Sequence, residues 1–433
     1  TAGFKAYWAG GCVRDMLLGV EPKDFDIATS AKPQEIKEIL KKTIPIGEQF
    51  GVVLAEENGH HFEIATFRSD SGYSDGRRPD AVTFTHAEDD AKRRDFTING
   101  MFYDPVEDRV FDFVEGQRDL DAGLVRFIGE PDERILEDHL RILRAIRFKN
   151  TLKAKNGEPF QYHPDTFRAV KHHALLIAKV SSERVRDELN KMLISDRAAD
   201  ALEDMEDTGV LEVILPELQA LKGVAQPLEY HKEGDVWDHM IGAVRALKPD
   251  APRNLRWAVM LHDIAKPETF KLEERIRYDK HAERSGELAR SILKRLKFSS
   301  KDIEHVAWLV EHHMSVYNVL DMSIGRRRHW FLHEWFLELL EVNRCDIAGT
   351  VPANYETYEK VYALYRADMR EMPQRPARLL TGEEIMEVLK IKPGPQIQKI
   401  LDELHELQLE KKITTKKEAE EWLQSRQKTK NKI

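Results

Sequence analysis

Two aspartates, Asp24 and Asp26, lie two residues apart in a stretch that the sequence predicts to be extended. Because side chains alternate between the faces of a strand, both carboxylates are expected on one face. Like charges at such short range repel unless a cation lies between them, and Mg²⁺ prefers hard oxygen ligands of this kind. The pair therefore predicts a magnesium site, although this spacing is also compatible with a solvated turn.

A glycine pair, Gly10 and Gly11, stands shortly before the aspartates, between an apolar run at residues 4–9 and a helical pattern at residues 12–18. Glycine lets the backbone approach a ligand, and the unpaired N–H groups of a helix N-terminus attract anions. Two adjacent glycines alone more often mark a simple turn. A strand, a glycine turn and a helix, followed by the aspartates, together predict a phosphate cradle beside a metal site.

The elements that must position these groups change in character along the chain. Residues 1 to about 125 contain short β-like runs (4–9, 52–55, 61–67, 81–84 and 110–114) and helical stretches such as 34–41. From about residue 126, apolar residues recur at helical spacing. The pattern predicts an α+β fold, with a small mixed head (1–125) followed by helical segments at 126–215, 216–350 and 351–433.

The composition is that of a water-soluble globular protein of 433 residues, with 33% charged and 41% hydrophobic residues. No apolar run approaches the roughly 20 residues of a membrane helix and no leader is visible, so we expect no membrane partner and a cytoplasmic location. Two cysteines, Cys12 and Cys345, exclude a disulfide scaffold. A net charge of −9 argues against indiscriminate coating of nucleic acid, although residues 126–191 carry a basic excess that suits a phosphate-tracking groove.

Several stretches match known motifs in order along the chain. The runs GGCVRDMLLG, DFDIAT and KRRDFTINGMFYDP are the most specific, and EDHLRILRAIRF and SSERVRDELNKML follow as weaker matches. Together they resemble the class II tRNA nucleotidyltransferases (CCA-adding enzymes) and bacterial poly(A) polymerases of the polymerase-β-like superfamily. The resemblance implies a nucleotidyltransferase head, a helical neck and template-independent addition of CCA to tRNA 3′ ends. The implied partners are the tRNA 3′ end, ATP and CTP, and no DNA is expected.

The same resemblance implies roles for individual residues. Asp24 and Asp26 would hold two Mg²⁺ ions that activate the RNA 3′-hydroxyl and steady the leaving pyrophosphate. Glu63 is a candidate third carboxylate, with a surface residue of an edge strand as its alternative, and an ion pair with Asp15 is the alternative for Arg14. The implied nucleotide-binding residues are Gly10, Gly11 and Arg14 at the triphosphate, Arg94 and Asp95 at the ribose, and Asn99, Asp138, Arg141, Arg144 and Arg147.

The run at residues 137–148 predicts one helix, with Glu137, Arg141 and Arg144 on one face and Asp138 beside them. A carboxylate accepts hydrogen bonds only and a guanidinium donates only. If Asp138 and Arg141 face a base edge together, they accept from an exocyclic amine and donate to the adjacent ring nitrogen. Adenine and cytosine present that pattern and guanine and uracil the reverse, so the pair predicts selection of ATP and CTP. A salt-bridged helix surface is the alternative.

Residues 68–84 are rich in Gly, Ser, Asp and Arg, which predicts a mobile loop. This segment resembles the flexible loop of complete CCA-adding enzymes. Its presence counts against an enzyme that adds only CC, but an enzyme that adds only the terminal A stays open, as does a poly(A) polymerase. Two further alternatives are a metal-dependent phosphohydrolase whose head only binds RNA and a catalytically silent tRNA-binding module.

Nine of the 17 histidines lie between residues 231 and 333. Their runs, among them LHDIAKPETF and LVEHHMSV, resemble an HD phosphohydrolase domain, named for an adjacent His-Asp pair. The resemblance implies that helical His and Asp residues bind a divalent cation such as Mn, Fe, Ni or Zn. A degenerate domain that serves only as a scaffold is the alternative. The implied ligands are His239 (or His231), His262, Asp263 and Asp346, with His281 and either His312 or His313 at a second position.

Overall fold

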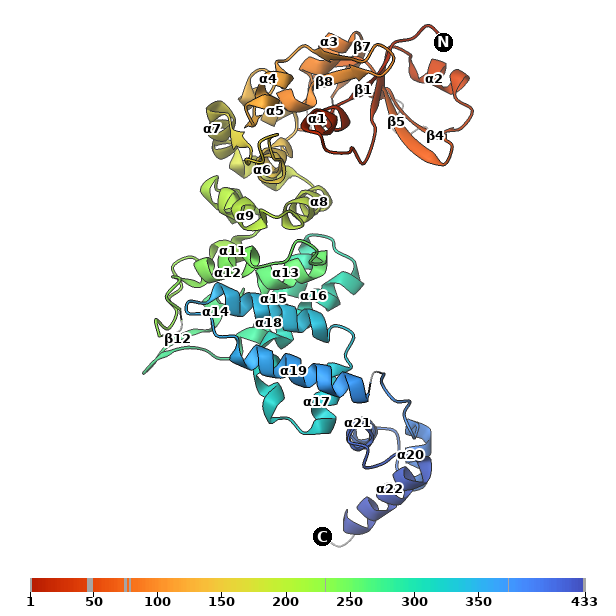
Figure 1. Ribbon diagram of the computed structural model, residues 1–433, viewed down its shortest axis with the longest axis vertical. Helices are drawn as coiled ribbons and strands as arrows, with labels where there is room; N and C mark the ends of the chain where they lie inside the picture. Colours follow the sequence, from red (N-terminus) through yellow and green to blue (C-terminus); the bar gives the residue numbers. More distant parts are fainter. Residues whose placement is uncertain are drawn as a thin grey trace. The chain divides into compact units, whose positions relative to one another are not determined.

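The computed structural model describes residues 2–44, 50–73, 76–77, 79–229, 231–372 and 374–430 (Figure 1). The chain divides into two compact units. The first comprises Thr1–Ala220, Lys248–Arg253 and Ile292–Phe298, and the second comprises Leu221–Leu247, Asn254–Ser291 and Ser299–Ile433. In the described part of the chain, no helix combines the length and the apolar character needed to cross a membrane.

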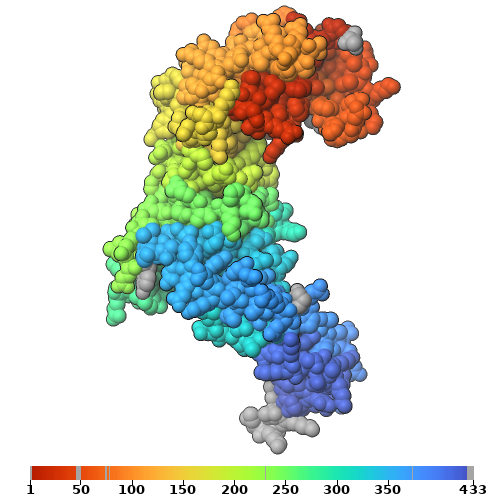
Figure 2. All heavy atoms as spheres, viewed as in Figure 1, coloured from red at the N-terminus to blue at the C-terminus, as the bar shows by residue number. Residues whose placement is uncertain are grey.

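The head of the first unit is built on a seven-stranded mixed sheet with the order β3-β4-β5-β2-β1-β8-β9. Strand β1 pairs antiparallel with both β2 and β8, and β2 pairs parallel with β5. In Figure 2 the atoms of this head, in red and orange, form one continuous mass. The strands are β1 (Ala6–Ala9), β2 (Ile27–Thr29), β3 (Thr43–Ile44), β4 (Val52–Glu57), β5 (His60–Thr66), β8 (Met101–Asp104) and β9 (Arg109–Asp112).

Aromatic side chains form the core of the head. Tyr7 of β1 packs against Phe67 and Phe102, with ring centroids 5.9 and 6.3 Å away, and all three are buried. Burial of such rings is a main source of stability in a small sheet, because each removes a large apolar area from water. The core therefore holds β1 rigidly, and the glycine turn and α1 (Gly11–Leu18) follow directly from its end.

The remaining elements of the first unit are short strands and helices. Strands β10 and β11 pair in parallel and β6 and β7 pair antiparallel. The elements are α2 (Pro33–Ile39), β6 (Arg68–Ser71), β7 (Ala81–Phe84), α3 (Ala87–Lys92), η2 (Thr97–Asn99), α4 (Gly116–Asp121), β10 (Leu124–Val125), α5 (Pro131–Glu137), α6 (Arg141–Thr151), β11 (Gln161–Tyr162), α7 (Pro164–His172), η3 (Ala174–Lys179), α8 (Ser182–Leu193), α9 (Ala198–Asp207), α10 (Val210–Ile214) and α11 (Pro216–Gln219).

In the residues that the structure describes, the second unit is helical apart from one hairpin of β12 and β13. Its last three helices bury their own apolar cluster around Ile385 and Leu404. The elements from residue 236 onward are α12 (Val236–Arg245), α13 (Arg253–Leu261), α14 (Lys266–Thr269), β12 (Phe270–Leu272), β13 (Ile276–Tyr278), α15 (His281–Arg295), α16 (Ser300–His312), η4 (His313–Asp321), α17 (Ile324–Phe331), α18 (Phe336–Gly349), α19 (Glu356–Glu371), α20 (Gly382–Leu389), α21 (Pro395–Leu409) and α22 (Lys416–Lys430).

The comparison of these elements with the sequence pattern confirms the α+β class and corrects three details. Asp24 and Asp26 precede β2 and do not lie within a strand. The expected loop at 68–84 begins and ends in the paired strands β6 and β7, while its residues 74, 75 and 78 lie outside the described residues. The chain beyond residue 126 also contains the small strand pairs β10–β11 and β12–β13, which the helical pattern did not predict.

The single helix expected at residues 137–148 is wrong. Helix α5 ends at Glu137, Asp138 has extended backbone angles (φ −145°, ψ 106°), and α6 begins at Arg141. The Asp138 carboxylate accepts a hydrogen bond from the backbone N–H of Leu140 at 3.1 Å. Aspartate often breaks helices in this way, because its side chain competes for backbone N–H groups. The break separates Asp138 from the helix that carries the neighbouring arginines.

Candidate functional site

A cavity of about 530 Å³ opens in the first unit, where the head meets α6 and α8. It gathers residues from segments that are far apart in the sequence, and the expected nucleotide-binding residues all line it. Seven arginines face four carboxylates there, so the wall is strongly basic. The charged and polar lining residues are Arg14, Asp26, Glu63, Arg93, Arg94, Asp95, Asn99, Asp138, Arg141, Arg144, Arg147 and Arg184.

The glycine turn brings the backbone of β1 against one wall of the cavity. Gly10 has φ 75°, in the left-handed region that favours glycine, and a Cβ there would lie 2.9 Å from Nη1 of Arg94. Any side chain at Gly10 would therefore displace the arginine. Helix α1 begins at Gly11, which lines the cavity, so the N-terminus of a helix lies at the cavity wall.

A chain of hydrogen bonds crosses the cavity floor. Arg14 donates to Asn99 Oδ1 at 2.7 Å, Asn99 donates to Asp95 Oδ1 at 3.1 Å, and Arg144 Nε donates to Asp95 Oδ2 at 2.7 Å. Burial opposes ionisation of Asp95, but the guanidinium groups of Arg144 and Arg141 lower its pKa to about 2. Asp95 is therefore a fixed negative charge that orients Arg144 and Asn99. Arg14 also pairs with Asp15, so its surface ion pair and its place in the cavity coexist.

An aromatic ring lies among three of the arginines. The guanidinium carbons of Arg14, Arg144 and Arg147 lie 5.1, 5.2 and 4.0 Å from the centroid of Phe148. Cation–π contacts of this kind hold the three planar groups in place without neutralising them. Arg147 is further anchored by Glu188 of α8 at 2.5 Å. The geometry presents a preorganised cluster of positive charge to an anionic ligand.

The candidate metal ligands Asp24, Asp26 and Glu63 differ in their relation to the cavity. All three residues are exposed; Asp26 and Glu63 line the cavity, whereas Asp24 lies outside its lining. Partial burial raises the pKa of Asp26, and the charge of Asp24 adds to this effect. Partial burial and then the charge of Asp26 likewise raise the pKa of Glu63. Asp26 is therefore repelled by the charges of both Asp24 and Glu63, and a divalent cation would relieve this repulsion.

The two expected base-reading residues are both in the cavity, but each is held by a different partner. Asp138 accepts from Arg184 Nη1 and Nη2 at 3.1 and 2.7 Å. Arg141 donates to Glu137 at 2.5 Å and to the backbone carbonyls of Arg134 and Arg93. The two side chains are thus independently fixed and do not neutralise each other. The pair of Arg141 with Glu137 is an i,i+4 ion pair of the kind that the salt-bridged alternative predicts, whereas Asp138 pairs with Arg184 and not with Arg141.

Among the charged and aromatic lining residues, three were not named as site residues from the sequence. Arg184 lies in the run SSERVRDELNKML, and that weak motif was the signal that pointed to it. Arg93 shares the buried carboxylate of Asp90 with Arg94, with bonds of 2.9 and 3.0 Å. The sequence predicts Phe148 to be a core residue, because a single aromatic residue at helical spacing does not indicate a binding role.

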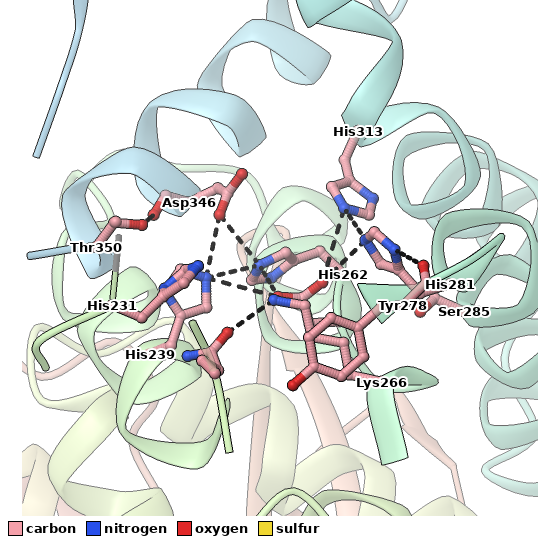
Figure 3. Close-up of polar contacts among 12 residues, drawn as sticks. His231, His239, His262, Lys266, Tyr278, His281, Ser285, His313, Asp346 and Thr350 are labelled. Atoms are coloured by element: carbon pink, nitrogen blue, oxygen red, sulfur yellow. Dashed lines mark hydrogen bonds and ion pairs between the residues drawn. The ribbon is translucent and has the colours of Figure 1, made fainter. Parts of the chain in front are cut away.

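The second unit contains a separate cluster of imidazoles and carboxylates (Figure 3). His239 Nε2 lies 3.3 Å from His262 Nε2 and 3.1 Å from Asp346 Oδ1. His239 comes from α12 and Asp346 from α18. These two helices pack against each other at Gly349 of α18. A Cβ on Gly349 would fall 2.6 Å from the carbonyl oxygen of His239. Only glycine allows the close approach that brings the two ligand groups together.

A second set of groups adjoins the first. His281 Nε2 lies 3.3 Å from His313 Nε2 and 3.4 Å from Asp263 Oδ1. That Asp263 oxygen is buried and has no hydrogen-bond partner among the residues that the structure describes, while Oδ2 pairs with Lys266 at 2.7 Å. Burial opposes ionisation of Asp263, but Lys266 and His262 hold its pKa well below the usual range. Burial, together with the charge of His262, lowers the pKa of His313 to about 4.

The imidazole tautomers follow from the backbone contacts. Nδ1 of His262, His281 and His313 lies 2.8, 2.9 and 2.7 Å from a backbone carbonyl oxygen, which only accepts hydrogen bonds. In the neutral rings, Nδ1 therefore carries the proton and Nε2 carries a lone pair. The Nε2 atoms of His281 and His313 then face each other with no proton between them. A divalent cation fits such facing lone pairs, and imidazole and carboxylate groups are suitable ligands.

The structure gives His231 and His312, the two alternative ligands, different positions relative to the cluster. His231 lies beside the cluster, with Nδ1 2.6 Å from Glu233, and the same carboxylate lies 3.4 Å from Nδ1 of His239. His231 and His239 are therefore linked through Glu233, a residue that the sequence did not single out. His312 is not part of the cluster, because its ring packs against Trp308 and Trp330 with centroids 4.8 and 5.2 Å away.

Three protein-family descriptions match successive parts of the chain. The poly A polymerase head domain matches residues 6–126, the probable RNA- and SrmB-binding site of polymerase A matches residues 159–222, and a domain described as "tRNA nucleotidyltransferase domain 2 putative" matches residues 281–422. A CCA-adding enzyme of Lactobacillus gasseri is 40% identical over 264 residues, which cover 59% of this chain and 64% of that enzyme. The matched region is therefore less than two thirds of the length of that enzyme.

Two further relatives match over most of their length. A CCA-adding enzyme of Pediococcus pentosaceus is 31% identical over 411 residues, covering 93% of this chain and 89% of the enzyme. The crystal structure of the Bacillus stearothermophilus CCA-adding enzyme in complex with CTP superimposes with a TM-score of 0.71 at 26% identity, covering 99% of this chain and 95% of that chain. Because the Pediococcus pentosaceus enzyme is more than 30% identical over 93% of this chain, the chain belongs to the CCA-adding enzyme family.

Proposed function

We propose that this protein adds CCA to tRNA 3′ ends without a nucleic-acid template, transferring CMP, CMP and AMP from CTP and ATP. The observation that carries the proposal is the cavity that joins the glycine turn, the carboxylates Asp26 and Glu63, and the separately held Asp138 and Arg141. The similar Bacillus stearothermophilus enzyme was solved with CTP, which supports a nucleotide in the corresponding cavity. With tRNA as its substrate, the protein is proposed to act in the cytoplasm.

The residues of the cavity have distinct tasks in this proposal. The N–H groups at Gly11 and the guanidinium of Arg14 bind the triphosphate, while Asp95 and Arg94 position the ribose. Asp24 and Asp26, with Glu63, are the residues that would hold Mg²⁺. When bound, the metal supplies charge stabilisation for the attacking hydroxyl and the leaving pyrophosphate. Preorganised guanidinium groups add electrostatic stabilisation, because they need no reorganisation as negative charge develops.

Base selection follows from donor and acceptor chemistry. Arg184 and the Leu140 N–H fix the Asp138 carboxylate, which accepts from the amine of cytosine or adenine. Arg141, fixed by Glu137 and two carbonyl groups, donates to the ring nitrogen. With GTP or UTP, the carboxylate would face a carbonyl acceptor and the guanidinium would face an N–H donor. Each unpaired group would cost about 1–3 kcal/mol. The protein thereby replaces a nucleic-acid template.

The test uses tRNAs that end at the discriminator base, at C and at CC, each with CTP and ATP separately and together. A CCA-adding enzyme completes all three when both nucleotides are present and stops after one A. An enzyme that adds only A acts on the CC end alone, and a poly(A) polymerase extends with ATP beyond one residue. Either of these last patterns would contradict the proposal, and no incorporation would indicate a silent binding module.

A second function is favoured by the histidine–carboxylate cluster of the second unit. We propose that this cluster is an HD-type metal centre that hydrolyses phosphoesters, with Asp346, His239 and His262 at one position and Asp263, His281 and His313 at the other. The facing Nε2 atoms and the unpartnered Asp263 oxygen support it. Mn, Fe, Ni and Zn all suit these donors. Metal analysis of the purified chain, followed by phosphoester hydrolysis with each metal, separates an active centre from a scaffold.

A further inference from the structure

A buried carboxylate binds two of the arginines that line the nucleotide cavity of the head. Asp90 lies on the short helix α3 and is only 1% exposed. Its Oδ1 accepts from Nε of Arg93 at 2.9 Å, and its Oδ2 accepts from Nε and Nη2 of Arg94 at 3.2 and 3.0 Å. Burial opposes ionisation of Asp90, but the charges of Arg94 and Arg93 hold its pKa below the usual value. Asp90 does not line the cavity, so any part that it has in the chemistry passes through the arginines.

The two arginines use this carboxylate differently. Arg93 is shared between two carboxylates, because its Nη1 lies 3.6 Å from Asp70 Oδ2. Arg94 presents Nε and Nη2 to Asp90, and in the described part of the chain its Nη1 has no hydrogen-bond or ion-pair partner. A Cβ on Gly10 would meet that Nη1 at 2.9 Å, so the atom lies at the glycine turn. Asp90 therefore leaves one donor group of Arg94 open to a ligand, where the ribose and the triphosphate are proposed to meet.

An aromatic ring further restricts the guanidinium of Arg94. Its Cζ lies 5.0 Å from the ring centroid of Phe102, a fully buried residue of β8. A cation–π contact favours this position and does not neutralise the charge. Asp90 and Phe102 together hold the guanidinium in one place before any nucleotide binds, which is the preorganisation that electrostatic stabilisation requires.

Asp26, a candidate metal ligand, is a second carboxylate within reach of the charge of Arg94. Burial raises the pKa of Asp26, and Arg94 is the group whose charge lowers it again. The two groups thus interact through space, yet no ion pair joins them among the described residues. Opposite charges attract more strongly at a partly buried site than in water. Without Asp90, the guanidinium would be drawn to Asp26 and would occupy an oxygen that Mg²⁺ needs.

We propose that Asp90 is a positioning residue for nucleotide addition, which holds Arg94 at the glycine turn and away from Asp26. Arg94 then binds the nucleotide through Nη1, and the Asp26 carboxylate stays open to Mg²⁺. This inference rests on the proposed nucleotidyl transfer. Asp90 also accepts from the backbone N–H of Arg68 at 3.3 Å, which joins α3 to β6. If that link were its whole role, loss of Asp90 would lower stability and leave the Mg²⁺ requirement unchanged.

The first experiment measures CMP incorporation by the full chain, into a tRNA that ends at the discriminator base, as a function of Mg²⁺ concentration. In Asp90→Asn, the Mg²⁺ concentration for half-maximal rate should rise roughly tenfold, because a charge-assisted pair of Arg94 with Asp26 must be broken. The KM for CTP should also rise, whereas kcat at saturating Mg²⁺ and CTP should change little. Arg94→Gln added to Asp90→Asn should return the Mg²⁺ requirement to that of the wild type, because the competing cation is gone.

Glu88→Gln is the matched control, because Glu88 lies on the same helix and pairs with Lys92 at 2.7 Å on the surface. It should behave as the wild type, and thermal midpoints show whether each variant folds. Asp90→Asn leaves two guanidinium groups around a neutral side chain. Asp90→Asn with Arg93→Gln removes one of these cations and is the second form of the test if the single variant unfolds. It should show the same rise in the Mg²⁺ requirement.

The second experiment does not depend on catalysis. Equilibrium dialysis with labelled CTP and Mg²⁺, without tRNA, gives the Kd of the wild type, Asp90→Asn, Arg94→Gln and the double variant. Each single change should weaken binding roughly tenfold and the double change no more than either alone, because both act through one guanidinium. This pattern in a chain that incorporates no nucleotide would overturn the proposed function and leave the role of Asp90 standing. Additive losses of CTP binding, or an unchanged Mg²⁺ requirement in Asp90→Asn, would overturn the role of Asp90.

Discussion

Replacement of Arg184 tests the proposed base-reading arrangement most directly. Arg184 does not need to touch the nucleotide, but its two donors hold the Asp138 carboxylate at 2.7 and 3.1 Å. Its removal leaves the Asp138 carboxylate with one described hydrogen bond, from the Leu140 N–H. The carboxylate can then rotate away from the position at which it accepts from the base amine. Arg184→Ala should therefore impair the choice of nucleotide as well as the rate.

The magnitude follows from the loss of a charge-assisted pair. Hydrogen bonds to charged groups contribute about 1.5–3 kcal/mol, and both side chains are only about a quarter exposed (24% and 20%), so screening is limited. At about 1.4 kcal/mol per factor of ten, kcat/KM for CTP and ATP should fall roughly 10- to 150-fold. UTP should lose much less, so discrimination against it narrows. Arg184→Lys, which keeps the charge without the paired donors, should lie between the variant and the wild type.

The assay measures kcat/KM for all four nucleotides on one tRNA acceptor, with the thermal midpoint as a check on folding. Arg186→Ala is the matched control, because Arg186 lies on the same helix and bonds Asp187 and the Lys297 carbonyl instead. An unchanged nucleotide profile in Arg184→Ala would refute the role of Asp138 in base reading. An equal loss for every nucleotide would reduce Arg184 to a residue that supports the fold.

Three further predictions concern the metals and a buried ion. Asp24→Ala or Asp26→Ala should leave a folded protein that incorporates no labelled CMP, and more than a few per cent of residual activity would contradict the two-metal assignment. His262→Ala with Asp263→Ala should remove the divalent metal of the second unit, measured by elemental analysis, and should spare nucleotide addition. Asp95 has its pKa lowered from 3.8 to about 2, so its stabilising charge is present above pH 4 and is lost as the pH falls to 2. The difference in unfolding free energy between Asp95→Asn and the wild type, measured by urea denaturation, should therefore shrink by about 2 kcal/mol over that interval, and a constant difference would show that the ion pair is not formed.

Local sequence already determined the mixed head, the helical remainder and most of the candidate site. The glycine turn, the two aspartates and the arginine-rich motifs are defined by residue type and short spacing. Both can be read from the sequence without a structure. Strands that follow apolar alternation, such as β4 and β5, were also predictable. Short strands such as β2 and β8 were not, because three or four residues carry too little periodic signal to outweigh their surroundings.

Tertiary structure alone decided how the groups meet. The pattern at residues 137–148 favours a continuous helix, yet Asp138 breaks it, because its carboxylate is bound by a backbone N–H and by Arg184, 46 residues away. Likewise, nothing in the sequence distinguished His312 from His313, and only the packing of α16 and η4 directs one ring into the cluster and the other onto tryptophan. Residue type sets which reactions a chain is able to perform. The partners of each side chain depend on long-range packing, whose contacts no local pattern encodes.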